Sequence, residues 1–165
     1  IKVFVLVALT LAAMSVSAQV KLGHIETQKL IQAMPEWTAA QKTFEEEQKK
    51  VNTELNSLRE QFQTKLAEYS EKMKTYSEAM RATTEEELQG LQQRIQRFQE
   101  TAMAQLEKTQ NDLMPPVMEK ALNAIKEVGK ENGFTYIFDM NAGILYAAEN
   151  SQDVLPLVKK KLGLQ

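Results

Sequence analysis

The amino-acid sequence lacks cysteine and contains a single histidine, His24, in 165 residues. Without cysteine the chain can form no disulfide, thiol nucleophile or cysteine-ligated zinc site. A site that requires two imidazoles is excluded as well. The sequence also carries no P-loop, dinucleotide-binding fingerprint or nucleophile elbow. We therefore expect a protein that is not an enzyme and that uses no cofactor or metal.

Turn-forming residues and positive charges are also few. Six glycines and four prolines predict long helices rather than many turns. Lysine and arginine number 20 against 22 aspartate and glutamate residues, which gives a formal net charge of −2. Proteins dedicated to nucleic acids usually carry a basic surface. We therefore expect no nucleic-acid partner.

Residues 1–18 have the pattern of a secretion signal. One positive charge, Lys2, precedes an apolar run over residues 3–14, and small residues lead up to Ala18. The run is shorter than the roughly 20 residues that a membrane-crossing helix needs. The alternative is an uncleaved membrane anchor. We expect cleavage after Ala18, so that residues 1–18 are a signal peptide and residues 19–165 an exported chain.

Long helices are predicted between residues 35 and 132, where Gly90 and Gly129 are the only glycines. Apolar residues recur there mostly at steps of three and four, which is the spacing of a coiled-coil seam. Pro115 and Pro116 should kink the second helix, because proline removes a backbone donor and disfavours helical geometry in the residue before it. The first set of recurring apolar residues comprises Phe44, Val51, Leu55, Leu58, Phe62, Leu66, Tyr69, Met73, Tyr76 and Met80, and the second comprises Leu88, Leu91, Ile95, Phe98, Ala102, Leu106, Leu113, Val117, Ala121, Ile125 and Val128.

A break between the two seams is predicted near residue 83. Thr84 and Glu87 have the spacing of a capping box, and three consecutive glutamates suit the positive end of a new helix. The break separates two stretches of 48 residues, 35–82 and 84–131, which predicts an antiparallel hairpin with equal arms. The alternative is one straight helix through residue 83 whose partner belongs to another chain.

Short strand patterns flank the helical region. Residues 20–26 alternate in polarity, and a second strand at 134–139 should turn at 140–143 into a return strand at 144–148. A sheet this small rarely stands alone in water, so we expect it to be completed by oligomerisation. The expected fold class is α+β: a β-rich oligomerisation body from residues 19–34 and 115–165, and a helical hairpin from residues 35–114.

Shorter signals place the remaining elements. Leu30 belongs to a short amphipathic helix before the proline at position 35. Gly133 should end the long returning helix. A last short helix is expected from Val154 to Leu162, with Asp153 or Ser151 as its cap.

Two groups of side chains are candidates for function. Methionine and tyrosine are adaptable and amphipathic, which suits a surface that meets varied partners. The first group, on the hairpin, comprises Tyr69, Met73, Tyr76, Met80 and Met103, for which the alternative is packing within the seam. The second group, in the body, comprises Leu22, Ile25, Phe134, Tyr136, Ile137, Phe138, Ile144 and Tyr146.

The remaining polar candidates have structural interpretations. We expect His24 to be a packed or hydrogen-bonded residue of the first strand. Asp139 and Asn141 fall at a predicted turn, where their side chains favour local bonds to the backbone. The alternative for these two residues is a calcium site.

Segments near both ends of the exported chain resemble those of a known protein family. Residues 21–30, Lys-Leu-Gly-His-Ile-Glu-Thr-Gln-Lys-Leu, and the motif Met34-Pro35-Glu36 resemble the opening of the Skp/OmpH family of periplasmic chaperones. Residues 133–147, from Gly-Phe-Thr-Tyr-Ile-Phe-Asp to Gly-Ile-Leu-Tyr-Ala, are similar to its closing segment. The order of these segments around a long hairpin makes the resemblance specific.

The resemblance implies a homotrimer in the periplasm of a Gram-negative bacterium. Strands of three subunits would form a β-barrel body, and three helical hairpins would enclose a cavity. The implied function is ATP-independent holding of unfolded outer-membrane proteins. A competing hypothesis is a structural adaptor of the cell envelope that docks one defined partner. Residues 39–114 hold eleven Lys and Arg against fourteen Asp and Glu, so we do not extend lipopolysaccharide or membrane-surface binding to this acidic hairpin.

Overall fold

The structure is a computed structural model that describes residues 20–148 and 151–164. The predicted signal peptide lies outside these residues. The chain divides into two compact units. We call residues 20–28 together with 123–164 the sheet unit, and residues 29–122 the hairpin unit. A short helix, α2 (Thr27–Gln32), stands before the long helices, as predicted.

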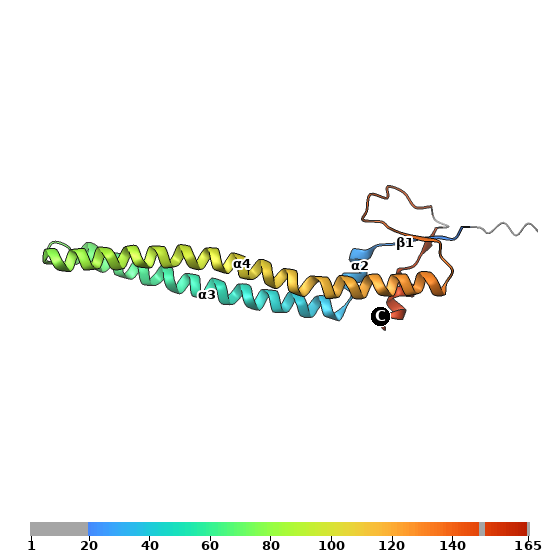
Figure 1. Ribbon diagram of the computed structural model, residues 1–165, viewed down its shortest axis with the longest axis horizontal. Coiled ribbons are helices and arrows are strands. Elements are labelled where there is room, and N and C mark those ends of the chain that lie inside the picture. The colour runs from blue at the N-terminus through green and yellow to red at the C-terminus, as the bar shows by residue number, and fades with distance from the viewer. Residues whose placement is uncertain (1–19, 149–150, 165) are drawn as a thin grey trace, which may run out of the picture. The chain divides into compact units, whose positions relative to one another are not determined.

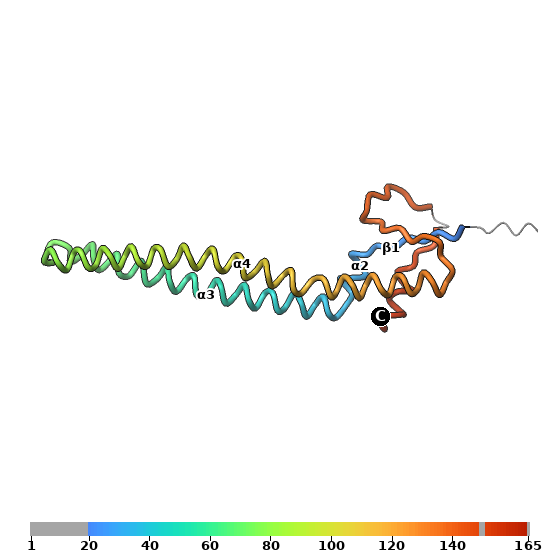
Figure 2. Tube along the Cα trace, in the orientation of Figure 1, coloured from blue at the N-terminus to red at the C-terminus, as the bar shows by residue number. Residues whose placement is uncertain are grey.

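The hairpin unit is formed by two long antiparallel helices (Figures 1 and 2). Helix α3 (Pro35–Lys72) begins at the proline, and α4 (Glu78–Glu131) returns beside it. Leu58 and Leu88 are buried, while most other positions on the two helices are exposed or half-buried. The predicted hairpin is therefore confirmed, and the single straight helix is wrong.

The turn of the hairpin lies at residues 73–77 rather than near residue 83. Ser77 caps the new helix, because its Oγ accepts a hydrogen bond from the Met80 N–H at 3.3 Å. Thr84 lies inside the helix and its hydroxyl donates to the Met80 carbonyl at 2.8 Å. The predicted capping box at Thr84 and Glu87 is thus wrong.

The arms are also unequal, at 38 residues for α3 and 54 for α4. The difference arises because the turn precedes the predicted break and because α4 continues into the sheet unit. Pro115 and Pro116 lie inside α4, which is a single helix on both sides of them. The two prolines therefore do not interrupt the helix, and the kink expected at them stays a prediction.

The sheet unit contains three short parallel strands. β1 (Leu22–Ile25) lies between β2 (Tyr136–Asp139) and β3 (Gln152–Asp153). Leu22 is opposite Tyr136 in the register, and His24 is opposite Phe138 on one side and Asp153 on the other.

The predicted return strand at residues 144–148 is wrong, because this segment has no regular structure. A turn does follow β2, with the Ala142 N–H donating to the Asp139 carbonyl at 3.0 Å. The chain then leaves β2 without pairing antiparallel to it. Its next strand, β3, pairs with β1 instead, so the sheet is parallel and not a β-hairpin.

Buried side chains join the sheet to the helices of its own unit. Ile25, Val128, Val154 and Val158 are almost fully buried. Helix α5 (Leu155–Lys161) follows β3, and the Leu155 N–H donates to Asp153 Oδ1 at 2.8 Å. The N-cap position of α5 is Val154, which makes no side-chain cap hydrogen bond. The predicted cap at Asp153 or Ser151 is therefore wrong, although the Asp153 carboxylate accepts a hydrogen bond from the first residue of the helix.

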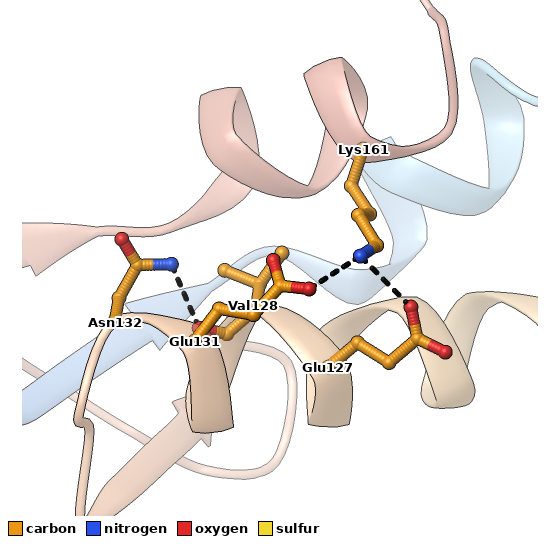
Figure 3. Close-up of polar contacts among 5 residues, drawn as sticks. All are labelled: Glu127, Val128, Glu131, Asn132 and Lys161. Carbon is orange, nitrogen blue, oxygen red and sulfur yellow. Dashed lines mark hydrogen bonds and ion pairs between the residues drawn. The ribbon is translucent and has the colours of Figure 1, made fainter.

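An ion-pair cluster holds α5 against the end of α4 (Figure 3). Lys161 Nζ lies 2.5 Å from Glu131 Oε1 and 3.1 Å from Glu127 Oε2. Helix α4 ends at Glu131, and the predicted stop at Gly133 follows it: the positive φ of 67° at Gly133 lets the Phe134 N–H reach the Gly129 carbonyl at 2.9 Å.

Candidate functional site

The first candidate surface is the turn end of the hairpin. Tyr69 and Tyr76 meet there, with ring centroids 6.3 Å apart and planes inclined by 50°. The Tyr69 hydroxyl also donates to Glu85 of α4. This hydrogen bond is the main reason that the pKa of Tyr69 is raised. The two tyrosines thus contribute to closing the turn as well as to its surface.

The methionines of the predicted contact group are exposed. Met73 lies in the turn, and Met80 lies on the first turns of α4. Met80 is 53% exposed and Met103, farther along α4, is 73% exposed. Flexible thioether side chains at such positions can contact partners of different shape. These residues are available for binding in the hairpin unit as it stands.

Ion pairs between the arms fix the hairpin on either side of its middle. Lys65 of α3 pairs with Glu87 of α4. Near the other end, Glu36 pairs with Lys120. The hydrogen bond from Lys120 is the largest cause of the lowered pKa of Glu36, so this carboxyl stays ionised to lower pH. The methionines are therefore carried by arms that are tied to each other at several points.

The second candidate surface is one face of the parallel sheet. Leu22 and Tyr136 are register partners on neighbouring strands, and Phe138 follows two residues after Tyr136 on the same face. All three are exposed, Tyr136 to 60%. The rings of Tyr136 and Phe138 stack with centroids 6.1 Å apart. This face is an apolar surface of the kind that associates with another protein surface.

The other predicted body residues divide into packed and exposed positions. Ile25 is buried, and Ile137 lies half-buried beside Gly129, where an added β-carbon would be 3.3 Å from Ile137 Cδ1. Phe134 is half-buried under the Lys21 ammonium, which is 4.2 Å from the ring centroid. After the turn, Ile144 is half-buried and Tyr146 is exposed.

The segment after β2 adds to the exposed apolar area of the sheet unit. Leu145 is 99% exposed. It lies in residues 144–148, which the sequence pattern predicts to be a strand. Along residues 144–148 the pattern of a strand is present without a strand partner among the described residues. A segment of this kind can pair with a strand of another chain.

Polar side chains in the sheet unit form hydrogen bonds that stabilise its fold. His24 Nδ1 is 2.8 Å from the Ser151 hydroxyl, which confirms the expected hydrogen-bonded histidine. Asp139 Oδ1 accepts from the backbone N–H groups of Asn141 at 3.0 Å and Thr27 at 3.3 Å, which confirms the expected local bonding. Within residues 20–148 and 151–164, no cluster of three or more acidic or histidine side chains is placed to hold a metal ion.

Sequence reasoning missed two positions of interest. The first position is Ser77, where a serine followed by Glu78 is a signal for the start of a helix. Residues 84–87 match a capping box more fully, so the helix start was predicted there instead. Trp37, the only tryptophan, lines a cavity between α3 and α4. The signal available for the cavity was the spacing of Trp37, Ala40 and Phe44 along one helix face.

Comparison with known protein families identifies the chain. Residues 21–162 match the family model described as Outer membrane protein (OmpH-like). The match covers most of the sequence, so the chain belongs to the OmpH-like family. No curated protein matches the sequence significantly.

Membership has consequences at the level of the family. The OmpH-like family is a periplasmic chaperone family that binds outer-membrane proteins, and it is not a family of enzymes. The resemblance noted from the sequence is confirmed. In the part of the chain that the structure describes, none of the helices is both long and apolar enough to span a bilayer.

Proposed function

We propose that this protein is a trimeric, ATP-independent holdase of the periplasm that keeps unfolded outer-membrane β-barrel proteins from aggregating. The observation that carries the proposal is a long helical hairpin with exposed methionines in a chain of the OmpH-like family. Met73, Met80 and Met103 offer soft apolar contacts that do not select one folded shape.

The chemistry of such clients fits this surface. An unfolded β-barrel chain exposes unpaired backbone groups and alternating apolar side chains, both of which promote aggregation. Many weak contacts with flexible side chains shield these groups without fixing one client structure. Binding of this kind needs no nucleotide, because release follows when the client folds into a more stable state elsewhere.

The proposal includes assembly into a trimer through the sheet unit. Leu22, Tyr136 and Phe138 form an exposed apolar face, and residues 144–148 have a strand-like sequence but belong to no described strand. Both features suit association with another chain. A second and third copy of the chain supply the partner surface with the same residues. Three hairpins then border one cavity, and the client occupies it.

The charge of the hairpin limits what else it binds. Residues 39–114 carry a net charge of −3 from eleven basic and fourteen acidic side chains. An acidic surface repels anionic lipids and lipopolysaccharide. We therefore propose protein clients only.

The test is dilution of a urea-unfolded outer-membrane β-barrel protein into buffer with and without the purified chain. Light scattering should fall to the baseline at about one trimer per client. Unchanged scattering at an excess of trimer would refute the holdase proposal. A pull-down that yields one folded partner in fixed ratio, instead of several unfolded clients, would favour a structural adaptor.

A further inference from the structure

A cavity of about 190 Å³ lies between α3 and α4 in the hairpin unit, at the end away from the turn. Trp37, Ala40 and Phe44 line it from α3, and Leu113 and Met114 line it from α4. The α3 residues are spaced i, i+3 and i+7, so they share one face of that helix. Two glutamines, Gln41 and Gln110, complete the lining.

The cavity exists because a small residue occupies a buried position between two aromatic ones. Ala40 is 7% exposed and contributes only a methyl group to the space between the helices. Trp37 lies one turn before it and Phe44 one turn after it, and both are half-buried. The aromatic rings hold the space open at both ends, while the alanine leaves it unfilled.

The lining selects an uncharged group. None of its residues is charged, although lysine and glutamate are frequent on both helices. The side-chain amides of Gln41 and Gln110 can each donate and accept a hydrogen bond, as a peptide backbone requires. The site is therefore complementary to an apolar side chain carried on an extended peptide, and not to an ion or a charged metabolite.

The volume and the lining together select an aromatic ring. An apolar cavity of roughly 150 Å³ is large enough to bind benzene. Aromatic faces and a methionine sulfur make favourable contacts with an inserted ring. We propose that this cavity binds one aromatic side chain of an extended client segment.

This inference rests on the proposed function, because it names part of the client. Transmembrane β-barrel chains carry girdles of aromatic residues near the ends of their strands. Unfolded clients of this class therefore present the required side chain on an extended backbone. The cavity is a second contact point, separate in sequence from the exposed methionines Met73, Met80 and Met103.

Trp37 provides a direct measurement, because it is the only tryptophan in the chain. The probe is a soluble heptapeptide of serine and threonine with phenylalanine at its centre, titrated into the full exported chain. A saturable change in tryptophan emission is expected. The matched peptide with leucine at its centre should bind about tenfold more weakly. No response, or equal affinity for the two peptides, would overturn the inference.

Variants of neighbouring alanines locate the binding. Ala40→Leu fills the cavity and should abolish the emission change, whereas Ala39→Leu, at an exposed position of α3, should leave it unaltered. Helix content by circular dichroism shows whether Ala40→Leu folds. Unaltered binding by the folded Ala40→Leu chain would contradict the proposed site.

A surface label tests the site without a change in the core. The chain has no cysteine, so Gln41→Cys accepts a bulky maleimide at one exposed position of the cavity lining. The label should weaken binding of the phenylalanine peptide at least about tenfold, and the same label on Ala39→Cys should not. Equal affinity for the two labelled chains would overturn the inference.

The two proposals fail separately. If the chain suppresses client aggregation but the phenylalanine peptide does not bind, the holdase proposal stands and the cavity site is refuted. If the peptide binds at the cavity but aggregation continues, the cavity site is supported and the holdase proposal is refuted.

Discussion

Gly23 of β1 lies so close to Phe134 that a β-carbon added at Gly23 would be 2.9 Å from the Phe134 ring. The same β-carbon would be 3.0 Å from Val154 Cγ1. Val154 is fully buried, so it has little room to move away. The glycine of the opening motif is therefore required by the packing of strand, ring and helix in the sheet unit.

Gly23→Ala should lower the free energy of unfolding by about 1–3 kcal/mol, because the added methyl overpacks a closed contact. Urea unfolding followed by circular dichroism measures the change. Gly90→Ala is the matched control, since a β-carbon at Gly90 meets no atom within 4 Å. That control should gain up to about 1 kcal/mol from helix propensity. Equal stability of Gly23→Ala and the unaltered chain would contradict the packing account.

The double variant Ile137→Asp with Ile144→Asp should give monomers, because both isoleucines belong to the proposed assembly body. The single variants should differ. Ile137 packs beside Gly129, so an aspartate there is left without a partner in an apolar contact and should disrupt the sheet. Ile144 lies outside every described strand, and its aspartate should leave the sheet folded. Light scattering that shows a trimer for the double variant would refute this placement of the interface.

Lys161→Met should lower the thermal midpoint at pH values below 10.5, the usual pKa of lysine, and this loss should shrink only as pH rises through the higher pKa that Lys161 has in the folded chain. Hydrogen bonds from Lys161 to Glu131, and then to Glu127, raise the pKa of the lysine above its usual 10.5. A group with a raised pKa in the folded chain stabilises it fully below the unfolded pKa, and this contribution is lost as pH rises through the folded value. The midpoints of the two chains should therefore converge in alkaline buffer.

Lys160→Met is the control for this prediction. Lys160 lies in the same last turn of α5, so it too is close to the negative end of the helix dipole. Its replacement should change the midpoint less than that of Lys161 at neutral pH. If the two variants lose the same stability, the ion pairs with Glu127 and Glu131 contribute nothing beyond the dipole.

The helical part of the fold was readable from the sequence because one physical pattern dominates it. The three-and-four spacing from Val51 onwards predicted long amphipathic helices correctly. The antiparallel hairpin was inferred from two equal arms about a capped break, and it is present although the arms are unequal and the break lies elsewhere. The same spacing misplaced the turn, because Met73, Tyr76 and Met80 continue it through a segment that is not helical. A serine cap at Ser77 decided the helix start, and a single hydroxyl is a weaker sequence signal than the glutamate triplet at residues 85–87.

The sheet was less predictable because its pairing is non-local. The strand at residues 136–139 was expected, but its neighbour is β1, more than a hundred residues away along the chain. Gln152 and Asp153 of β3 have no strand propensity, and they pair with β1 only because the fold brings them together. The methionines of the hairpin were named as candidates from residue type alone; they are exposed, and their role in binding stays a prediction. The cavity beside Trp37 depends on how the faces of two helices meet, which residue type does not indicate.

Replacing Met73, Tyr76 and Met80 together by serine should weaken client holding while the assembly stays intact. The change removes the soft apolar contacts at the turn end and leaves the sheet unit unaltered. The concentration of chain that halves client scattering should rise several-fold relative to the unaltered protein. Met118→Ser, which removes another exposed methionine of α4 far from the turn, is the control. Unchanged holding by the triple variant would show that these residues serve only the hairpin seam.

Native mass spectrometry of the exported chain mixed with a urea-diluted outer-membrane β-barrel protein tests the central claim most directly. One spectrum reports both the number of subunits and the number of bound clients. The account predicts a particle of three chains that gains the mass of one unfolded client. A monomer in the absence of client, or a trimer that gains no client mass while the client aggregates, would contradict it.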